Sequence, residues 1–139
     1  MVKSEEKTTK KKRFAKAIVE LKLLSDRIAE GVGSGAGIFT VKYQMLYLIS
    51  SNGKTSPQEL IQKLNMAKSN LAIMAKKMVM EGLIVSSKEI TNKKQVYYTI
   101  TEKGKKELSV KMNAIDNLCD SHNKEVLKYL ESIVETLKN

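Results

Sequence analysis

Two groups of polar side chains in this sequence are well suited to hydrogen bonding and to contact with anions: the run Lys68-Ser69-Asn70 and the pair Lys93-Lys94. Lys68, Ser69 and Asn70 are short or flexible hydrogen-bonding groups at the expected start of a helix. A helix of this kind fits the major groove of DNA, where Asn can bind adenine at two points and Lys can donate to guanine. Lys93 and Lys94 lie together in a polar turn, from which they can reach phosphate or the adjacent minor groove. The alternative for this pair is an ordinary solvated turn.

Residue types give little support to catalytic or metal chemistry. The chain has one Cys, Cys119, and one His, His122, which make no recognisable zinc cluster. We find no convincing nucleophile–base pair or paired-carboxylate site, so an enzyme is the weakest hypothesis, and we expect no metal and no cofactor. A single Cys excludes a disulfide within the chain, which fits a reducing cytoplasm. The neighbouring Asp116 and Asp120 disfavour a reactive thiolate, so an inert Cys119 is favoured over a redox switch.

Charge is unevenly distributed along the chain. The formal net charge is +10, and residues 54–106 hold 11 basic and 4 acidic groups, whereas residues 107–139 hold 4 and 6. A basic region joined to a slightly acidic one favours a polyanion partner that meets one face of the protein. A lysine-rich proteome would produce the same excess without such a partner. No apolar run is longer than that of Met45–Ile49, which is far too short to span a bilayer, so we expect no membrane partner.

Hydrophobic spacing predicts the first two helices. Apolar residues recur every three or four positions from Phe14 to Ile28, which is typical of an amphipathic helix, and the alternating glycines of residues 31–37 then form a connector. Residues 1–12 are polar and lysine-rich, so we expect a disordered arm. A second helix is expected over about Val41–Ser50, with Thr40 as its N-cap. It is apolar on most sides and should be buried.

A capping box marks the third helix. In Ser56-Pro57-Gln58-Glu59 the Ser hydroxyl can accept from the backbone at Glu59, and Pro occupies the first helical position. This short helix should end near Leu64 and be followed, after a tight turn, by a fourth helix over about Lys68–Glu81, with Gly82 as its C-cap. Thr55, Ser56 and Gln58 can also donate to phosphate at the helix start, although capping is the more secure role of Ser56.

Beyond Gly82 the periodicity changes to that of strands. Residues 83–85 open one strand, residues 95–100 alternate as a second, and residues 91–94 form the turn of a hairpin. Another helix is expected from Thr101 to about Asp120. A last helix, about Asn123 to Leu137, carries a long apolar stripe that needs a partner.

Two short helices, a tight turn and a hairpin in this order make a winged helix-turn-helix within a mainly α fold with a small β-hairpin wing. Ile73 is unusual on the outward face of the fourth helix, where it either contacts a thymine methyl group or covers a neighbouring side chain. The predicted DNA-contacting residues are Thr55, Ser56, Gln58, Lys68, Ser69, Asn70, Ala72, Ile73, Lys76, Lys77, Lys88, Lys93 and Lys94.

Several of these motifs resemble the MarR family of regulators. The resemblance rests on Gly82-Leu83-Ile84, on Asn92-Lys93-Lys94 and on Ile100-Thr101-Glu102-Lys103-Gly104, which match that family's Gly-Leu-Val/Ile, Asp-Arg-Arg-type wing tip and Leu-Thr-Glu-Lys-Gly at the same spacing. It is specific over residues 55–107. The chain departs from the family's pattern at Asn92, where the family has Asp, and at Lys94, where the family has Arg. It also has Ile73 at a position where Arg is frequent in the family. The operator sequence and the DNA affinity of the wing therefore cannot be transferred from the family to this chain.

The resemblance implies a cytoplasmic transcriptional regulator, expected to be a repressor, that binds a palindromic operator in double-stranded DNA as a homodimer. The expected organisation is a disordered basic arm over 1–12, an N-terminal dimerisation helix and connector over 13–38, a DNA-binding domain over 39–104 and C-terminal dimerisation helices over 105–139. It also implies an unidentified small-molecule effector, for which Arg27, Tyr43, Met45 and Tyr47 are candidates, although core packing is their favoured role. The alternative function is a winged-helix module that binds protein instead of DNA.

Overall fold

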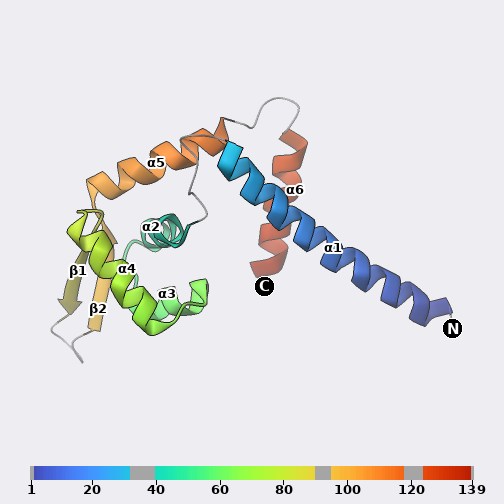
Figure 1. Ribbon diagram of the computed structural model, residues 1–139, viewed down its shortest axis with the longest axis horizontal. Coiled ribbons are helices and arrows are strands. Elements are labelled where there is room, and N and C mark those ends of the chain that lie inside the picture. The colour runs from blue at the N-terminus through green and yellow to red at the C-terminus, as the bar shows by residue number, and fades with distance from the viewer. Residues whose placement is uncertain (1, 32–39, 90–94, 118–123, 139) are drawn as a thin grey trace.

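The residues that the computed structural model describes form six helices and one hairpin (Figure 1). The structure describes residues 2–31, 40–89, 95–117 and 124–138, with side chains in the ranges 13–27, 40–88, 95–117 and 124–138. The elements are α1 (Val2–Gly31), α2 (Val41–Asn52), α3 (Pro57–Leu64), α4 (Lys68–Met80), β1 (Ile84–Glu89), β2 (Gln95–Ile100), α5 (Glu102–Asp116) and α6 (Lys124–Lys138). The predicted mainly α fold with a small hairpin is confirmed.

Helices α2, α3, α4 and α5 and the hairpin form one compact body around a shared core. Helix α2 lies at the centre of this body, as its apolar sequence predicts. Met45, Leu46 and Ile49 are fully buried, and α3, α5 and β2 pack around the helix. Thr40 occupies the N-cap as expected, but its side chain makes no capping hydrogen bond to the helix. The rest of the core is aliphatic apart from Tyr98, with contributions from α3, α4, the hairpin and α5: Leu60, Leu71, Ala75, Met78, Leu83, Ile84, Tyr98 and Leu108.

Local chemistry fixes the two helices that follow. The Ser56 hydroxyl accepts a hydrogen bond from the Glu59 backbone N–H at 3.2 Å, and Pro57 opens α3, as predicted. Asn65 ends α3 in the left-handed conformation, with φ 51°, and this lets the chain turn sharply into α4. Gly82 follows α4 with φ 78°, a value that favours glycine at the predicted end of that helix.

The hairpin is antiparallel, and Ile84 pairs with Ile100 at its base. Thr55 adds an isolated bridge to its outer side, because the Thr55 N–H donates to the Tyr98 carbonyl at 3.1 Å and the Tyr98 N–H donates back at 2.8 Å. The hairpin is thereby tied to the start of α3. Its predicted turn, with Lys93 and Lys94, lies outside the described residues.

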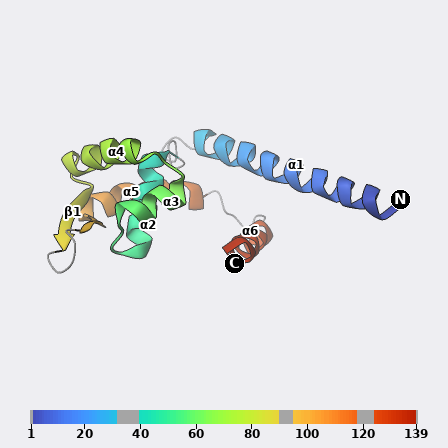
Figure 2. The same ribbon diagram turned by 90° about the horizontal axis from the view of Figure 1, so that it is seen from below.

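Helix α1 is longer than the sequence predicts. It begins at Val2, so the expectation of a disordered arm over residues 1–12 is corrected to a helix of 30 residues. The physical reason is that residues 2–30 contain neither Pro nor Gly, so nothing interrupts the helix once it starts. Figure 2 shows α1 extending away from the body, and it shows α1 and α6 apart from one another. Within the described ranges, no helix is both long enough and apolar enough to cross a membrane.

The C-terminal segments differ from expectation only at their ends. Helix α5 ends at Asp116 rather than near Asp120, and α6 begins at Lys124. Cys119 and His122 lie between them, outside the described residues, as does the expected glycine connector over residues 32–39.

Candidate nucleic-acid interface

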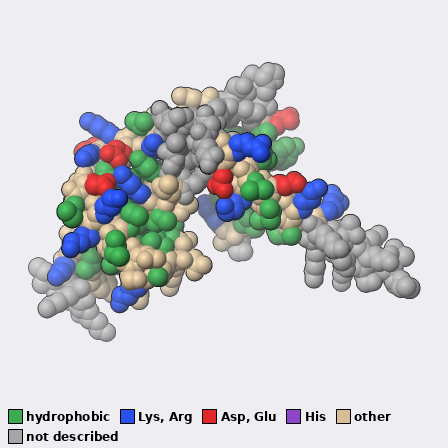
Figure 3. Space-filling model, in the orientation of Figure 1, with side chains coloured by type: hydrophobic (Ala, Val, Ile, Leu, Met, Phe, Trp, Pro, Cys, Tyr) green, Lys and Arg blue, Asp and Glu red, His purple; other side chains and the backbone are tan. Residues whose placement is uncertain are grey.

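Helix α4 presents a polar and basic face to solvent. Leu71, Ala75 and Met78 anchor its inner face in the core. Every residue of α4 that the sequence predicts to contact DNA is exposed: Lys68, Ser69, Asn70, Ala72, Ile73, Lys76 and Lys77. In Figure 3 the Lys and Arg side chains gather along the edge of the body where α4 and β1 lie.

Helical geometry orders these residues around α4. At about 100° per residue, Ser69, Ile73, Lys76 and Met80 lie within one narrow sector opposite the buried side chains. Asn70 and Lys77 flank this sector on one side, and Ala72 flanks it on the other. Ile73 is 70% exposed, and Met80 is 79% exposed. The centre of the outward face therefore combines one hydroxyl, one ammonium group and two apolar side chains.

A groove between α3 and α4 brings several predicted contacts together. Gln58, Lys68 and Ala72 line it, with Gln62 beside them. Tyr98 from β2 also lines the groove and is 8% exposed. Burial raises the pKa of Tyr98, so its phenol stays neutral at ordinary pH. The groove therefore offers hydrogen-bond donors and one ammonium group along the line where the two helices meet.

Thr55 is placed differently from its prediction. Its side chain is 0% exposed, so its hydroxyl has no route to a phosphate, and the expected DNA contact is corrected. The cause is the bridge to Tyr98, which draws Thr55 under the hairpin. Ser56 and Gln58 remain at the start of α3, where Ser56 is half-buried in its capping role and Gln58 is exposed.

The hairpin contributes further positive charge. Lys88 is exposed on β1, as its predicted phosphate contact requires. Sequence reasoning missed Lys54, whose ammonium group lies 4.2 Å from the centre of the Tyr97 ring in β2. The two residues are 43 positions apart, and only the bridge from Thr55 to Tyr98 places them together. The one available signal was that Lys54 lies two residues before Ser56, the first residue of the capping box.

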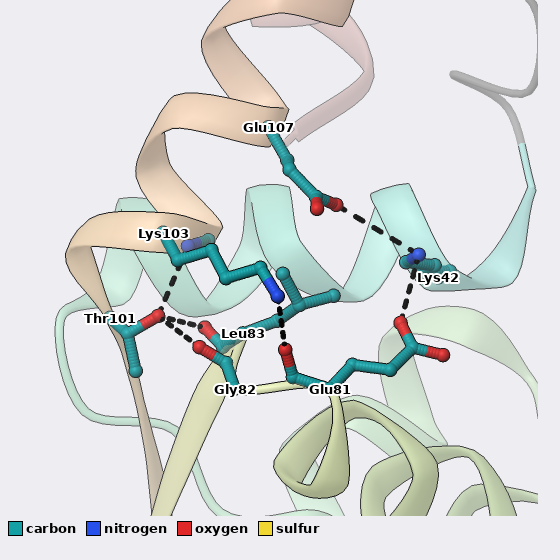
Figure 4. Close-up of polar contacts among 8 residues, drawn as sticks. Lys42, Glu81, Gly82, Leu83, Thr101, Lys103 and Glu107 are labelled. Carbon is teal, nitrogen blue, oxygen red and sulfur yellow. Dashed lines mark hydrogen bonds and ion pairs between the residues drawn. The ribbon is translucent and has the colours of Figure 1, made fainter.

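The end of α4 is tied to α2 and α5 by charged side chains (Figure 4). Lys42 Nζ lies 3.0 Å from a Glu81 carboxylate oxygen and 3.9 Å from one of Glu107. The hydrogen bond from Lys42 lowers the pKa of Glu81 below its ordinary value. Burial alone would lower the pKa of Lys42, but its hydrogen bond to Glu81 and the nearby carboxylates raise it.

Backbone atoms at the same junction are held by α5. Lys103 Nζ donates to the Glu81 carbonyl at 2.8 Å, which satisfies an otherwise open carbonyl at the end of α4. The Thr101 hydroxyl lies 2.7 Å from the Gly82 carbonyl and 3.0 Å from that of Leu83, and it accepts from the Gly104 N–H at 3.0 Å. The Thr-Glu-Lys-Gly motif thus fixes the outward helix and the wing to the body.

A second, apolar groove lies on the side of the body that faces α6. Tyr43, Tyr47 and Leu48 of α2 line it with Met112 and Leu137. Two of the effector candidates therefore lie at this groove, whereas Met45 is a fully buried core residue and Arg27 is not among the lining residues. An effector stays a prediction.

Comparison with known proteins agrees with this arrangement. Residues 41–119 match the family described as a winged helix DNA-binding domain, which is more than half of the chain. A curated relative, the HTH-type transcriptional regulator PchR of Bacillus subtilis (strain 168), is 33% identical over 55% of this chain and 52% of its own. The chain therefore spans about half the length of that relative.

Solved structures share the fold over nearly the whole chain. AbfR of Staphylococcus epidermidis superposes with a TM-score of 0.73 at 16% identity, covering 97% of this chain and 95% of AbfR. The Multiple Antibiotic Resistance Repressor, MarR, superposes with a TM-score of 0.66 at 19% identity, and the match covers 88% of this chain and 93% of the MarR chain. The structure of reduced AbfR bound to DNA superposes with a TM-score of 0.67 at 18% identity, and the match covers 96% of this chain and 95% of the AbfR chain.

Proposed function

The chain belongs to the family of winged helix DNA-binding domains, and from this premise we propose that it is a sequence-specific transcriptional regulator of the MarR type. The observation that carries the proposal is the outward face of α4. Its hydrogen-bonding and cationic side chains are exposed at Lys68, Ser69, Asn70, Lys76 and Lys77, while its opposite side is fixed in the core. A helix held in this way can enter the major groove without reorganising the body.

In this proposal, different residues in and around α4 contact the bases and the phosphate backbone. Ser69 and Asn70, in its first turn, read base edges, because the N-terminal part of a recognition helix lies deepest in the groove. Gln58, Lys68 and Lys88 contact the phosphate backbone, which fixes position and supplies most of the affinity. Lys93 and Lys94, which the sequence predicts for the turn of the hairpin, are proposed to reach the adjacent phosphates or the minor groove.

We propose that the DNA-binding unit is a homodimer joined by α1 and α6. The apolar stripe of α6 is unusually exposed for a soluble helix: Val126, Leu127, Leu130, Ile133, Val134 and Leu137 are between 40% and 64% exposed. Helix α1 carries a similar stripe, with Phe14 64% and Leu24 51% exposed. Exposed apolar faces at both ends of a chain favour pairing with a second copy, and a two-fold dimer matches a palindromic operator.

Repression is the proposed mode of action. A dimer that covers a palindrome overlapping a promoter blocks access to that promoter without contacting other proteins, and its place of action is the cytoplasm. Among the fold relatives, MarR is named a repressor and AbfR has been solved with DNA, which supports a DNA-binding role for the same arrangement of helices.

Selection of bound duplexes from random fragments, followed by affinity measurements over a salt series, tests the proposal. DNA binding predicts an affinity that falls steeply with salt, with a log–log slope of about −0.9 for each phosphate contact. The selected sequences should show two symmetric half-sites. Absence of binding to any duplex at low salt would refute the proposal.

A protein-binding winged helix is the second candidate function. The observation in its favour is the exposure of Ile73 and Met80 on the outward face of α4, at 70% and 79%. This candidate predicts no salt-dependent DNA affinity, so the same salt series distinguishes the two functions.

A further inference from the structure

Ile73 occupies the middle of the face that α4 presents to solvent. It is the sixth residue of the helix, with Ser69 one turn before it and Lys76 and Lys77 on the next turn. With 70% of its surface exposed, the side chain has most of its surface available to a partner. This exposure favours contact with a thymine methyl group over covering a neighbouring side chain.

The chemistry of the major groove limits what an aliphatic side chain can face there. Base edges carry hydrogen-bond donors and acceptors, and a side chain without polar atoms strips water from them without replacing it. The one apolar group in the groove is the 5-methyl group of thymine. An isoleucine at the centre of the recognition surface therefore disfavours guanine, adenine and cytosine beneath it and favours thymine.

We propose that Ile73 recognises the 5-methyl group of one thymine in each half-site and so selects thymine at that position. The inference rests on the proposed function, because it requires α4 to lie in the major groove. Ile73 is assigned rather than Met80 because Met80 is the last residue of α4, whereas the N-terminal half of such a helix lies nearest the bases. The flanking Lys76 and Lys77 then lie over the adjacent backbone.

Deoxyuridine provides a direct test, because it differs from thymidine only by that methyl group. A duplex recovered by selection is synthesised with each thymine of one half-site replaced in turn, and its affinity for the full-length protein is measured. At one position the wild type should bind about fourfold more weakly, the effect of about 0.8 kcal/mol for one buried methyl group. Replacement in both half-sites should multiply the losses.

Three variants test whether the effect arises from Ile73. Ile73→Ala should bind the thymine and deoxyuridine duplexes equally, and it should fold normally because Ala suits an exposed helical position. Val110→Ala, which trims an aliphatic side chain 57% exposed on α5, should retain the full response of the wild type. In a new selection, Ile73→Arg should exchange thymine for guanine at that position, since Arg binds guanine at two points.

The outcomes separate the two levels of the proposal. A wild type that binds its selected duplex but loses no affinity on any single replacement overturns the role of Ile73 and leaves DNA binding intact. A loss that persists unchanged in Ile73→Ala overturns it as well. A wild type that binds no duplex at low salt overturns the proposed function and this inference with it.

Discussion

Gly104 lies so close to Leu83 that a Cβ at position 104 would stand 2.3 Å from the Leu83 carbonyl oxygen. The same atom would lie 2.8 Å from Cγ1 of Ile100. The first obstacle is backbone, which cannot rotate away as a side chain can. This close approach lets the start of α5 meet the base of the wing, where the Thr101 hydroxyl lies within hydrogen-bond distance of the Gly82 and Leu83 carbonyls between α4 and β1.

Gly104→Ala should therefore lower the free energy of unfolding by about 1–3 kcal/mol, because the backbone of α5 or β1 must shift to admit the methyl group. Thermal or urea unfolding measures the loss. Ser109→Ala, at an exposed position of the same helix, is the matched control and should stay within about 0.5 kcal/mol of wild type. Equal stability of Gly104→Ala and wild type would mean that the junction is looser than described.

Removal of the Glu81 carboxylate should have a pH-dependent cost. The Lys42 hydrogen bond lowers the pKa of Glu81, so its contribution to stability is present above the ordinary carboxyl value of 4.5 and is lost as the pH falls through the lowered value. Urea midpoints of wild type and Glu81→Gln should thus differ at neutral pH and converge in acid.

The control for this prediction is Glu20→Gln. Glu20 pairs with Lys16 at 3.8 Å, and both side chains are more than half exposed, so that pair should contribute little at any pH. A gap between wild type and Glu81→Gln that stays constant from about pH 3 to about pH 8 would show that the ion pair does not act through the titration of Glu81.

Thr55→Val should leave the protein as stable as wild type or raise its free energy of unfolding by about 1 kcal/mol. The Thr55 hydroxyl is fully buried and, among the described residues, has no hydrogen-bond partner. Valine keeps its shape and removes the unsatisfied oxygen. Thr55→Ser keeps the oxygen and removes the methyl group, so it should be the less stable variant in denaturant unfolding, and neither change should alter DNA affinity.

Sequence patterns located most elements because local chemistry determines them. Three such signals each depend on residues close together in the sequence: the capping box at Ser56, the change of periodicity after Gly82 and the apolar stripe of α6. The resemblance to the MarR family is confirmed at the level of the fold. Thr55 was misplaced because its burial depends on a bridge to Tyr98, which lies 43 residues away. The pairs of Lys54 with Tyr97 and of Lys42 with Glu81 were missed for the same reason.

Lys88→Ala and Asn70→Ala should separate the two kinds of DNA contact. Lys88 is exposed on β1, the strand that follows α4, so its loss should weaken binding to every sequence alike and reduce the salt slope by about 1. Asn70 lies in the first turn of α4, so its loss should change which sequence is preferred. Selection with both variants and with Lys128→Ala on α6 measures these effects; an unchanged preference in Asn70→Ala would remove it from base reading.

The apolar stripe of α6 predicts how the assembly can be broken. Ile133 lies within that stripe and is 42% exposed, whereas Ser132 lies about 100° further around the helix, on its polar side. Ile133→Glu places a charge within the proposed dimer contact, where it would be desolvated without a partner, so it should shift the protein to monomer.

Ser132→Glu adds the same charge to the same helix outside the stripe, and it should remain a dimer by light scattering during gel filtration. The monomeric Ile133→Glu should retain its helix content, because the winged-helix body has its own core in α2, α3, α4, α5 and the hairpin. Its DNA affinity should nevertheless fall sharply, because one half-site then binds without the other tethered to it. Should Ile133→Glu still have the mass of a dimer by light scattering, α6 would not form the contact, and α1 would have to supply it alone.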